Sequence, residues 1–227
     1  MSVSEDRTVQ STPTPITLVS TPGIADPGPL GLAAFALTTF LLSANNAHWM
    51  THATGDAFLG FALAYGGLAQ LCAAMWEFRN RNVIGATGFG TFGAFWIGLG
   101  LYVLLVARPA VAAAVKAPIT LPATVAAIHH DEGWILLGFA IFTLYATILI
   151  AQTNVALFTT FLLLLVTLVV LAIAFFKLGS AATSGLLQTG GYLGLVTALA
   201  AWYTSMAGMA AGMGGKLRFP VGPPLVK

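Results

Sequence analysis

Residues 133–176, GWILLGFAIFTLYATILIAQTNVALFTTFLLLLVTLVVLAIAFF, form a run of 44 residues without a charged side chain. A helix needs about 20 apolar residues to cross the roughly 30 Å hydrocarbon core of a bilayer, so this run is too long for one span. The polar cluster Gln152-Thr153-Asn154 lies at its midpoint. The run therefore predicts two membrane-spanning helices, near 133–151 and 155–176, joined by a tight turn.

The rest of the chain has the same character. Only 7% of the 227 residues are charged, 58% are hydrophobic, and the mean hydropathy is +0.89; soluble proteins have roughly 25% charged residues. Three further uncharged runs, 27–55, 57–76 and 82–107, each have the length of a single span. The uncharged run 178–215 begins with a loop-like segment and predicts one more helix, from about Leu186 to Met209.

The predicted fold class is an all-α integral membrane protein with six transmembrane helices within residues 26–210. Residues 1–25 are rich in Ser, Thr and Pro and predict a flexible tail; residues 211–227 predict a second tail. Short loops and tails carry six basic residues on one side and three on the other, which predicts that both termini are cytoplasmic. The first apolar run starts near residue 30, behind Glu5 and Asp6, so no cleaved signal peptide is expected.

Composition also excludes several classes of function. The net charge of +2 provides no basic field for nucleic acid, so no nucleic-acid partner is expected. The single cysteine, Cys72, excludes an intramolecular disulfide and a Cys-only metal cluster. The middle of each predicted span lacks ionisable side chains, which argues against the charged relay of a pump or a voltage sensor.

Neutral polar side chains remain inside the predicted spans. Those of interest are Thr38, Thr39, Asn46, Tyr65, Gln70 and Thr91. A buried amide or hydroxyl costs roughly 1–3 kcal/mol when it is unpaired, so Asn46 and Gln70 need partners. Two interpretations stay open: these groups form hydrogen bonds between helices, or they line a pore whose neutral donors replace part of the hydration shell of a small anion.

The histidines support an alternative function as a membrane cofactor-binding subunit. His48 and His52 are four residues apart and are predicted to share one helical face, which could supply half of a zinc site. His129 and His130 precede Asp131 and Glu132 in a predicted long loop, 108–132. An interfacial pair for His48 and His52, and a solvated loop for His129 and His130, are the preferred interpretations, so no metal site, cofactor or catalytic residue is predicted.

Charged residues also follow the second predicted span. Glu77, Arg79 and Arg81 lie at its cytoplasmic end and are predicted to act together as a topological anchor.

Several short motifs occur in register with the six predicted spans. Asp26-Pro27-Gly28-Pro29-Leu30-Gly31-Leu32 precedes the first span, and the others are Thr38-Thr39 with Asn46, YGGLAQ at 65–70 followed by Glu77-Phe78, FGAFW at 92–96, Phe142-Thr143-Leu144, GYLG at 191–194 and Ala201-Trp202-Tyr203. The pattern resembles that of the acetate uptake transporters, the family of the bacterial acetate/succinate permease and the yeast ammonia/acetate Ato proteins. The likeness is dense over residues 26–107 and thinner afterwards.

The resemblance implies a ring-like homo-oligomer, hexameric in bacterial members, with one pore in each protomer. It implies an apolar constriction formed by Phe35, Phe92 and Leu164, and a small residue, Ala201, that influences substrate size. Two positions depart from the family pattern: Phe92 replaces an expected tyrosine, and Asp26 replaces the first asparagine of the signature.

The predicted function is therefore passage of small monocarboxylates, chiefly acetate, and also of the dicarboxylate succinate, across a cell membrane, with no enzymatic activity. Transport of ammonium or ammonia is the first alternative, and the histidine-based cofactor subunit is the second. A purely structural packing module is disfavoured, because buried Asn46 and Gln70 would then be a cost without a purpose.

Overall fold

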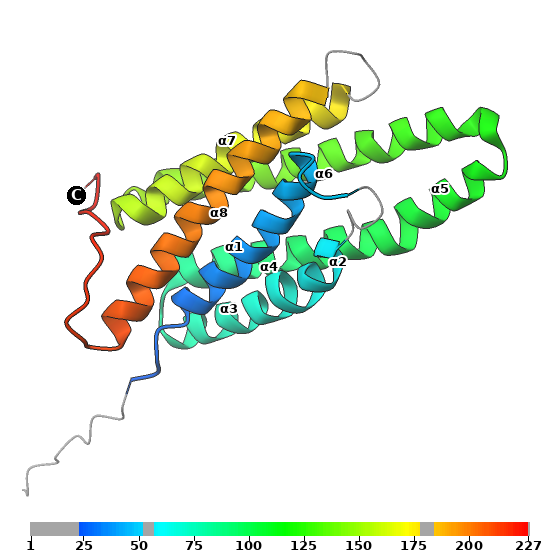
Figure 1. Ribbon diagram of the computed structural model, residues 1–227. Helices are drawn as coiled ribbons and strands as arrows, with labels where there is room; N and C mark the ends of the chain where they lie inside the picture. Colours follow the sequence, from blue (N-terminus) through cyan, green and yellow to red (C-terminus); the bar gives the residue numbers. More distant parts are fainter. Residues whose placement is uncertain (1–22, 52–56, 178–183, 227) are drawn as a thin grey trace, which may run out of the picture.

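The computed structural model describes residues 23–51, 57–177 and 184–226, and these parts of the chain are helical apart from turns and short extended segments (Figure 1). Within them, six helices are long and apolar enough to cross a membrane, as the sequence predicts. The predicted tail at 1–25 lies almost entirely outside the described residues, as does most of the predicted loop at 179–185.

The six spans follow the chain in order, and two of them are composite. They are α1 (Gly28–Asn46); α2 (Phe58–Phe61), η2 (Ala62–Ala69) and α3 (Gln70–Arg79) in succession; α4 (Val83–Tyr102), η3 (Val103–Ala107) and α5 (Arg108–Val115) in succession; α6 (Leu121–Ile150); α7 (Val155–Lys177); and α8 (Ser184–Gly212). The 3₁₀ turn η4 (Pro118–Thr120) joins α5 to α6.

The division of the long uncharged run is confirmed. α6 ends at Ile150 and α7 begins at Val155. Thr153 Oγ1 donates to the Ile150 carbonyl oxygen at 2.8 Å, which closes the turn. Asn154 Oδ1 accepts from the Leu157 N–H at 2.9 Å, so it satisfies a donor in the first turn of α7. The polar cluster at the midpoint therefore ends one helix and caps the next.

The predicted loop at 108–132 is wrong, because most of this segment is helical. α5 continues the third span to Val115, and α6 already begins at Leu121. Pro109 and Pro122 lie in the first turns of α5 and α6, where a helix needs no N–H from proline. The charged residues of this segment mark where the chain leaves an apolar layer, but a charge does not end a helix.

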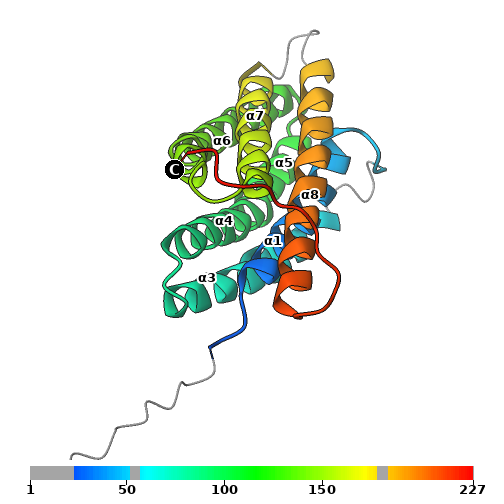
Figure 2. The same cartoon turned by 90° about the vertical axis from the view of Figure 1, so that its left-hand side faces the viewer.

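The spans form a closed ring of neighbours (Figure 2). α3 packs on α4 and on α1, α1 on α8, α8 on α7, and α7 on α6, while a smaller contact between α6 and α4 completes the ring. Glycines permit the closest approaches: a Cβ added at Gly93 of α4 would lie 2.9 Å from Leu71 Cγ and 3.1 Å from the Gly67 carbonyl oxygen.

The helix turn widens in the second span. η2 is an eight-residue π-helix directly before Gln70, and π-helical segments occur frequently at functional sites. The extra residue in each turn rotates the following α3 relative to a regular helix, and this rotation sets the direction in which Gln70 points.

The start of α1 and the end of α8 lie at the same end of the bundle, since Asp26 and Ala211 line one cavity. An even number of spans requires this arrangement. The segment predicted as a C-terminal tail folds back from that end across α7, in red in Figures 1 and 2.

Candidate functional site

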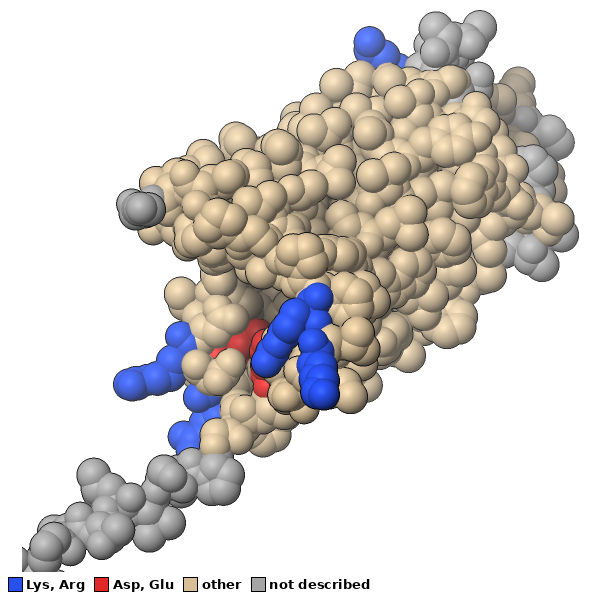
Figure 3. All heavy atoms as spheres, turned by 60° about the vertical axis from the view of Figure 1, so that its left-hand side comes forward, with Lys and Arg blue, Asp and Glu red and all other residues tan. Residues whose placement is uncertain are grey.

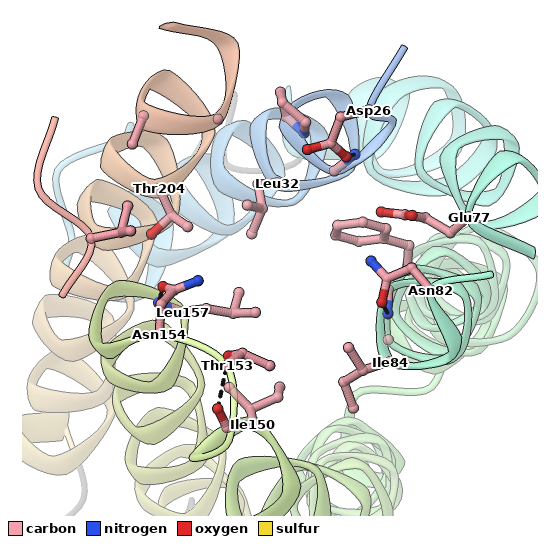
Figure 4. Close-up of a pocket in the computed structure, with 18 of the residues that line it drawn as sticks. Asp26, Leu32, Glu77, Asn82, Ile84, Ile150, Thr153, Asn154, Leu157 and Thr204 are labelled. Carbon is pink, nitrogen blue, oxygen red and sulfur yellow. Dashed lines mark hydrogen bonds between the residues drawn. The ribbon is translucent and has the colours of Figure 1, made fainter. Parts of the chain in front are cut away.

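A large cavity, which we call the vestibule, opens at the end of the bundle where α1 starts and α8 ends. Its volume is about 390 Å³. Side chains from α1, α3, the start of α4, the α6–α7 turn, α7 and α8 surround it (Figure 4). Those labelled in the figure are Asp26, Leu32, Glu77, Asn82, Ile84, Ile150, Thr153, Asn154, Leu157 and Thr204. The two helix turns, α3–α4 and α6–α7, therefore supply much of its polar rim.

A second, much smaller cavity continues inward from the vestibule. The two share Leu32, Gly88, Phe89 and Phe161, and the inner one has a volume of only about 20 Å³. One water molecule needs about 10–15 Å³ measured in this way. The inner cavity therefore has room for about one water molecule and is closed to any organic ion in this conformation.

Phe35, Phe92 and Leu164, which the family resemblance places in a constriction, all line this inner cavity. Their exposed fractions are 5%, 2% and 5%, and the ring centroids of Phe35 and Phe92 lie 5.6 Å apart in an edge-to-face arrangement. We call these three residues the apolar ring. The ring of Phe161 also packs against that of Phe92, with the ring centroids 6.4 Å apart. Phe89 and Phe161 were missed by the sequence analysis, because nothing distinguishes them from other aromatics in apolar runs.

Two polar side chains also line the inner cavity. Gln70 is 1% exposed, and its Oε1 is buried without a hydrogen-bond partner among the described residues. Thr160 was not predicted; its hydroxyl donates to the Ala156 carbonyl oxygen at 2.9 Å and lies 3.4 Å from Thr204 Oγ1. Because Thr204 lines the vestibule, this hydroxyl pair reaches from one cavity to the other.

The other predicted polar residues lie within the helix walls. Thr38, Thr39, Asn46, Tyr65 and Thr91, together with Ala201, line neither the vestibule nor the inner cavity. Thr38 is fully buried, and its hydroxyl donates to the Ala34 carbonyl oxygen of its own helix at 3.0 Å. Ala201 is also fully buried, whereas Tyr65 and Thr91 are half-buried. A pathway role for these six residues stays a prediction.

Two carboxylates lie inside the vestibule, and Figure 3 shows acidic atoms within a hollow with basic side chains at its rim. Asp26 Oδ1 accepts from the Gly28 N–H at 2.8 Å. Glu77 is 1% exposed and accepts from Asn80 Nδ2 at 3.4 Å. Of the three residues predicted to form a topological anchor, Glu77 is buried, whereas Arg79 and Arg81 are exposed; the anchor itself stays a prediction.

The predicted histidine arrangement is also wrong. α1 ends at Asn46, and His48 follows in a turn with φ of 61°, so it shares no helical face with a later residue. His52 lies outside the described residues. His129 and His130 lie within α6 and contact the rings of Phe175 and Phe176. In the described ranges, no three His, Cys, Asp or Glu side chains group to hold a metal ion.

Comparisons with known proteins give a consistent family. A model of the GPR1/FUN34/yaaH family matches residues 8–223. Acetate permease A of Emericella nidulans is 36% identical over 190 residues, and the Ammonia transport outward protein 2 of Saccharomyces cerevisiae is 36% identical over 186 residues. Each of these matches covers 82% of this chain and 62% of the relative, so the chain spans less than two thirds of their length.

A bacterial relative and a solved structure agree with this assignment. The Succinate-acetate/proton symporter SatP of Escherichia coli is 37% identical over 82 residues, which are 36% of this chain and 43% of that protein. The solved structure of the bacterial acetate channel SatP matches with a TM-score of 0.72 and 26% identity, over 88% of this chain and 99% of that one. The chain is thus a multi-pass, all-helical membrane protein that belongs to the GPR1/FUN34/yaaH family.

Proposed function

We propose that the protein moves small carboxylates, chiefly the monocarboxylate acetate and also the dicarboxylate succinate, through a pathway inside each protomer. The vestibule receives the anion, and the apolar ring is the point that it has to pass. The names of the relatives, an acetate permease, an acetate channel and a succinate-acetate/proton symporter, support this substrate class. We infer a transport role and not a catalytic one.

The observation that carries the proposal is the pair of cavities in series. A cavity of about 390 Å³ narrows to one of about 20 Å³ along shared walls, and Phe35, Phe92 and Leu164 meet at the narrow part. Apolar constrictions gate by excluding water, and permeation requires binding weak enough for the ion to leave. Gln70 and Thr160 at the same level provide neutral polar contacts, without the strong hold of a lysine or arginine.

We further propose the assembly and orientation. The protomers form a hexameric ring with one pore each, by family resemblance, in the plasma or inner membrane. The vestibule faces the cytoplasm, since Arg79, Arg81, Lys216 and Arg218 are exposed around that end of the bundle and basic residues favour the cytoplasmic side.

Ammonium or ammonia is the second candidate substrate, and the name of the yeast relative Ammonia transport outward protein 2 favours it. The purified protein, reconstituted in liposomes, separates the two candidates by uptake of labelled acetate and of labelled methylammonium, a stable ammonium analogue. Acetate uptake above that of protein-free liposomes supports the proposal. Methylammonium uptake without acetate uptake would replace it with the second candidate.

The Gln70→Leu variant should lose most acetate uptake while its folding is preserved or improved. The wild-type Gln70 Oε1 is buried and has no hydrogen-bond partner among the residues that the structure describes. A buried polar group without a partner costs about 1–3 kcal/mol, and leucine removes this cost. Leucine also removes the amide that faces the inner cavity. Acetate uptake and thermal unfolding in detergent measure the two effects, and Gln152→Leu in the exposed α6–α7 turn is the matched control. Unchanged uptake in a folded Gln70→Leu protein would place Gln70 in the packing and outside the pathway.

The Asp26→Asn variant should raise anion access without changing the fold. Asparagine Oδ1 can accept the Gly28 N–H bond as Asp26 does, so only a negative charge in the vestibule is lost. Such a charge acts over roughly 8 Å at physiological salt and is worth up to about 1 kcal/mol in water, or about fivefold in rate. Acetate uptake should rise more at low than at high ionic strength, whereas Asp131→Asn in α6, which does not line the vestibule, should show no such dependence. An increase that is independent of salt would show that Asp26 acts through structure and not through charge.

A further inference from the structure

The segment after α8 is held in place along its length. We call residues 217–226 the C-terminal strap. The Ala156 N–H donates to the Val221 carbonyl oxygen at 2.9 Å, and the Leu225 N–H donates to the Ala151 carbonyl oxygen at 2.9 Å. Tyr203 Oη of α8 donates to the Pro220 carbonyl oxygen at 2.7 Å. The strap is therefore bonded to both helices that flank it and to the α6–α7 turn.

The strap presents alternate side chains to the interior. Phe219 and Val221 are half-buried and line the vestibule, whereas the rest of the strap is exposed. This spacing of two is what an extended chain produces when one face is covered. The ring centroids of Tyr203 and Phe219 lie 6.4 Å apart in an edge-to-face arrangement. Two apolar side chains that follow the last span in the sequence thus form part of the vestibule wall.

A glycine allows the strap to lie this close to α7. Gly222 has φ of +74°, in the region that favours glycine, and a Cβ there would lie 2.8 Å from Val155 Cβ. Any other residue at this position would both strain the backbone and push the strap away from α7.

The outer side of the strap borders a separate groove. This groove, of about 340 Å³, lies between α7 and α8 and is lined by Val155, Ala156 and Tyr203 on the helices and by Pro220, Val221 and Gly222 on the strap. Val221 lines both the groove and the vestibule. Val221 therefore separates two spaces of similar volume.

We propose that Phe219 and Val221 determine which carboxylates the vestibule admits, because both form its side wall and Val221 also separates it from the groove between α7 and α8. This inference rests on the proposed function for its substrate, but the wall itself can be tested without transport. Shortening Phe219, which lines the vestibule but not the groove, should widen the vestibule at this wall and admit bulkier solutes, while the apolar ring stays unchanged.

The first test measures access directly. In a Cys72→Ser background, Leu157→Cys places a thiol on the vestibule wall, and its labelling rate is measured with a small and with a bulky thiol reagent. Phe219→Ala should accelerate the bulky reagent much more than the small one. Leu217→Ala, at an exposed strap residue that lines neither space, is the matched control. An unchanged ratio of the two rates would overturn the inference.

The second test measures selectivity in liposomes. Phe219→Ala should raise succinate uptake relative to acetate by roughly tenfold, the lower range of what apolar contacts contribute to discrimination. Val221→Ala, a milder truncation, should shift the ratio in the same direction and serves if Phe219→Ala does not fold. If the wild-type protein transports no carboxylate, the proposed function is contradicted. The labelling test would still show whether the strap controls access to the vestibule. Normal acetate uptake with unchanged ratios would contradict the strap inference alone.

Discussion

Leu164→Ala is expected to let larger carboxylates pass the apolar ring. Leu164 is 5% exposed and closes a cavity of about 20 Å³ together with Phe35 and Phe92. Alanine removes the branched end of the side chain without adding a polar group. The opening therefore becomes wider but stays apolar, and water is excluded less strongly only because the opening is larger. One methylene in an apolar pocket changes discrimination by roughly 10–200-fold, so succinate uptake relative to acetate should rise by at least about tenfold. Paired uptake assays in liposomes measure this ratio.

The matched control is Leu162→Ala on the same helix, where the side chain is 42% exposed and lines none of the three cavities described above. It removes the same atoms from α7 and should leave the ratio unchanged. If the Leu164→Ala protein is folded and keeps the wild-type ratio, its side chain packs against a helix without controlling passage, and the family register fails in α7.

Gly191→Ala should destabilise the bundle more than any other single-methyl addition discussed here. The added Cβ would lie 2.5 Å from the Ala47 backbone N and 2.8 Å from the Asn46 carbonyl carbon. These are main-chain atoms at the end of α1, so no side-chain rotation relieves the contact. Overpacking typically costs about 1–3 kcal/mol, which corresponds to a melting temperature lower by about 2–12 °C for a chain of this size. Thermal unfolding in detergent measures the shift.

Two controls separate this contact from the general effect of alanine in a helix. A Cβ at Gly98 of α4 or at Gly138 of α6 would lie within 4 Å of no atom in the described part of the chain. Alanine favours a helix over glycine by about 1 kcal/mol, so Gly98→Ala and Gly138→Ala should be neutral or stabilising. If Gly191→Ala has the same melting temperature as these two control variants, α1 and α8 pack less closely than described.

Much of the fold could be predicted from one kind of signal. The lengths of the uncharged runs predict six spans, because the bilayer thickness fixes how many apolar residues a span needs. The α6–α7 turn could be placed because Thr153 and Asn154 form local hydrogen bonds with the helix ends beside them. Such signals lie within a few residues of the helix end or turn that they determine, so they can be recognised in the sequence alone.

The errors share a different cause. The length of α5 and α6 was missed because charged residues were read as helix ends, although they limit only the apolar part. The π-helix η2 has no composition signal that separates it from an α-helix; its Gly66 lies close to Thr38 and Trp96, and its Gly67 close to Ile97, on other helices. The place of Phe219 in the vestibule wall depends on bonds to α7 and α8 that are distant in sequence. Features that depend on tertiary packing therefore cannot be predicted from the local sequence.

For the candidate site, the sequence alone gave only the polar residues and their depth, and the family register supplied the apolar ring. It placed Phe35, Phe92 and Leu164 together, as the structure does. Neither the sequence nor the family register distinguishes Gln70, which lines the inner cavity, from Thr38, which lines neither cavity. Both are polar residues in apolar spans, and only the rotation of each helix decides which one faces a cavity.

The size of the inner cavity also bears on the energetics of the host membrane. Space for about one water molecule, behind phenylalanine and leucine side chains, offers no continuous water file for protons or metal cations. Moving one elementary charge through 100 mV is worth about 2.3 kcal/mol, which a leaking pore would dissipate with every ion. In this conformation we expect the protein to be an electrical insulator, so a cell can hold many copies at rest without discharging its membrane potential.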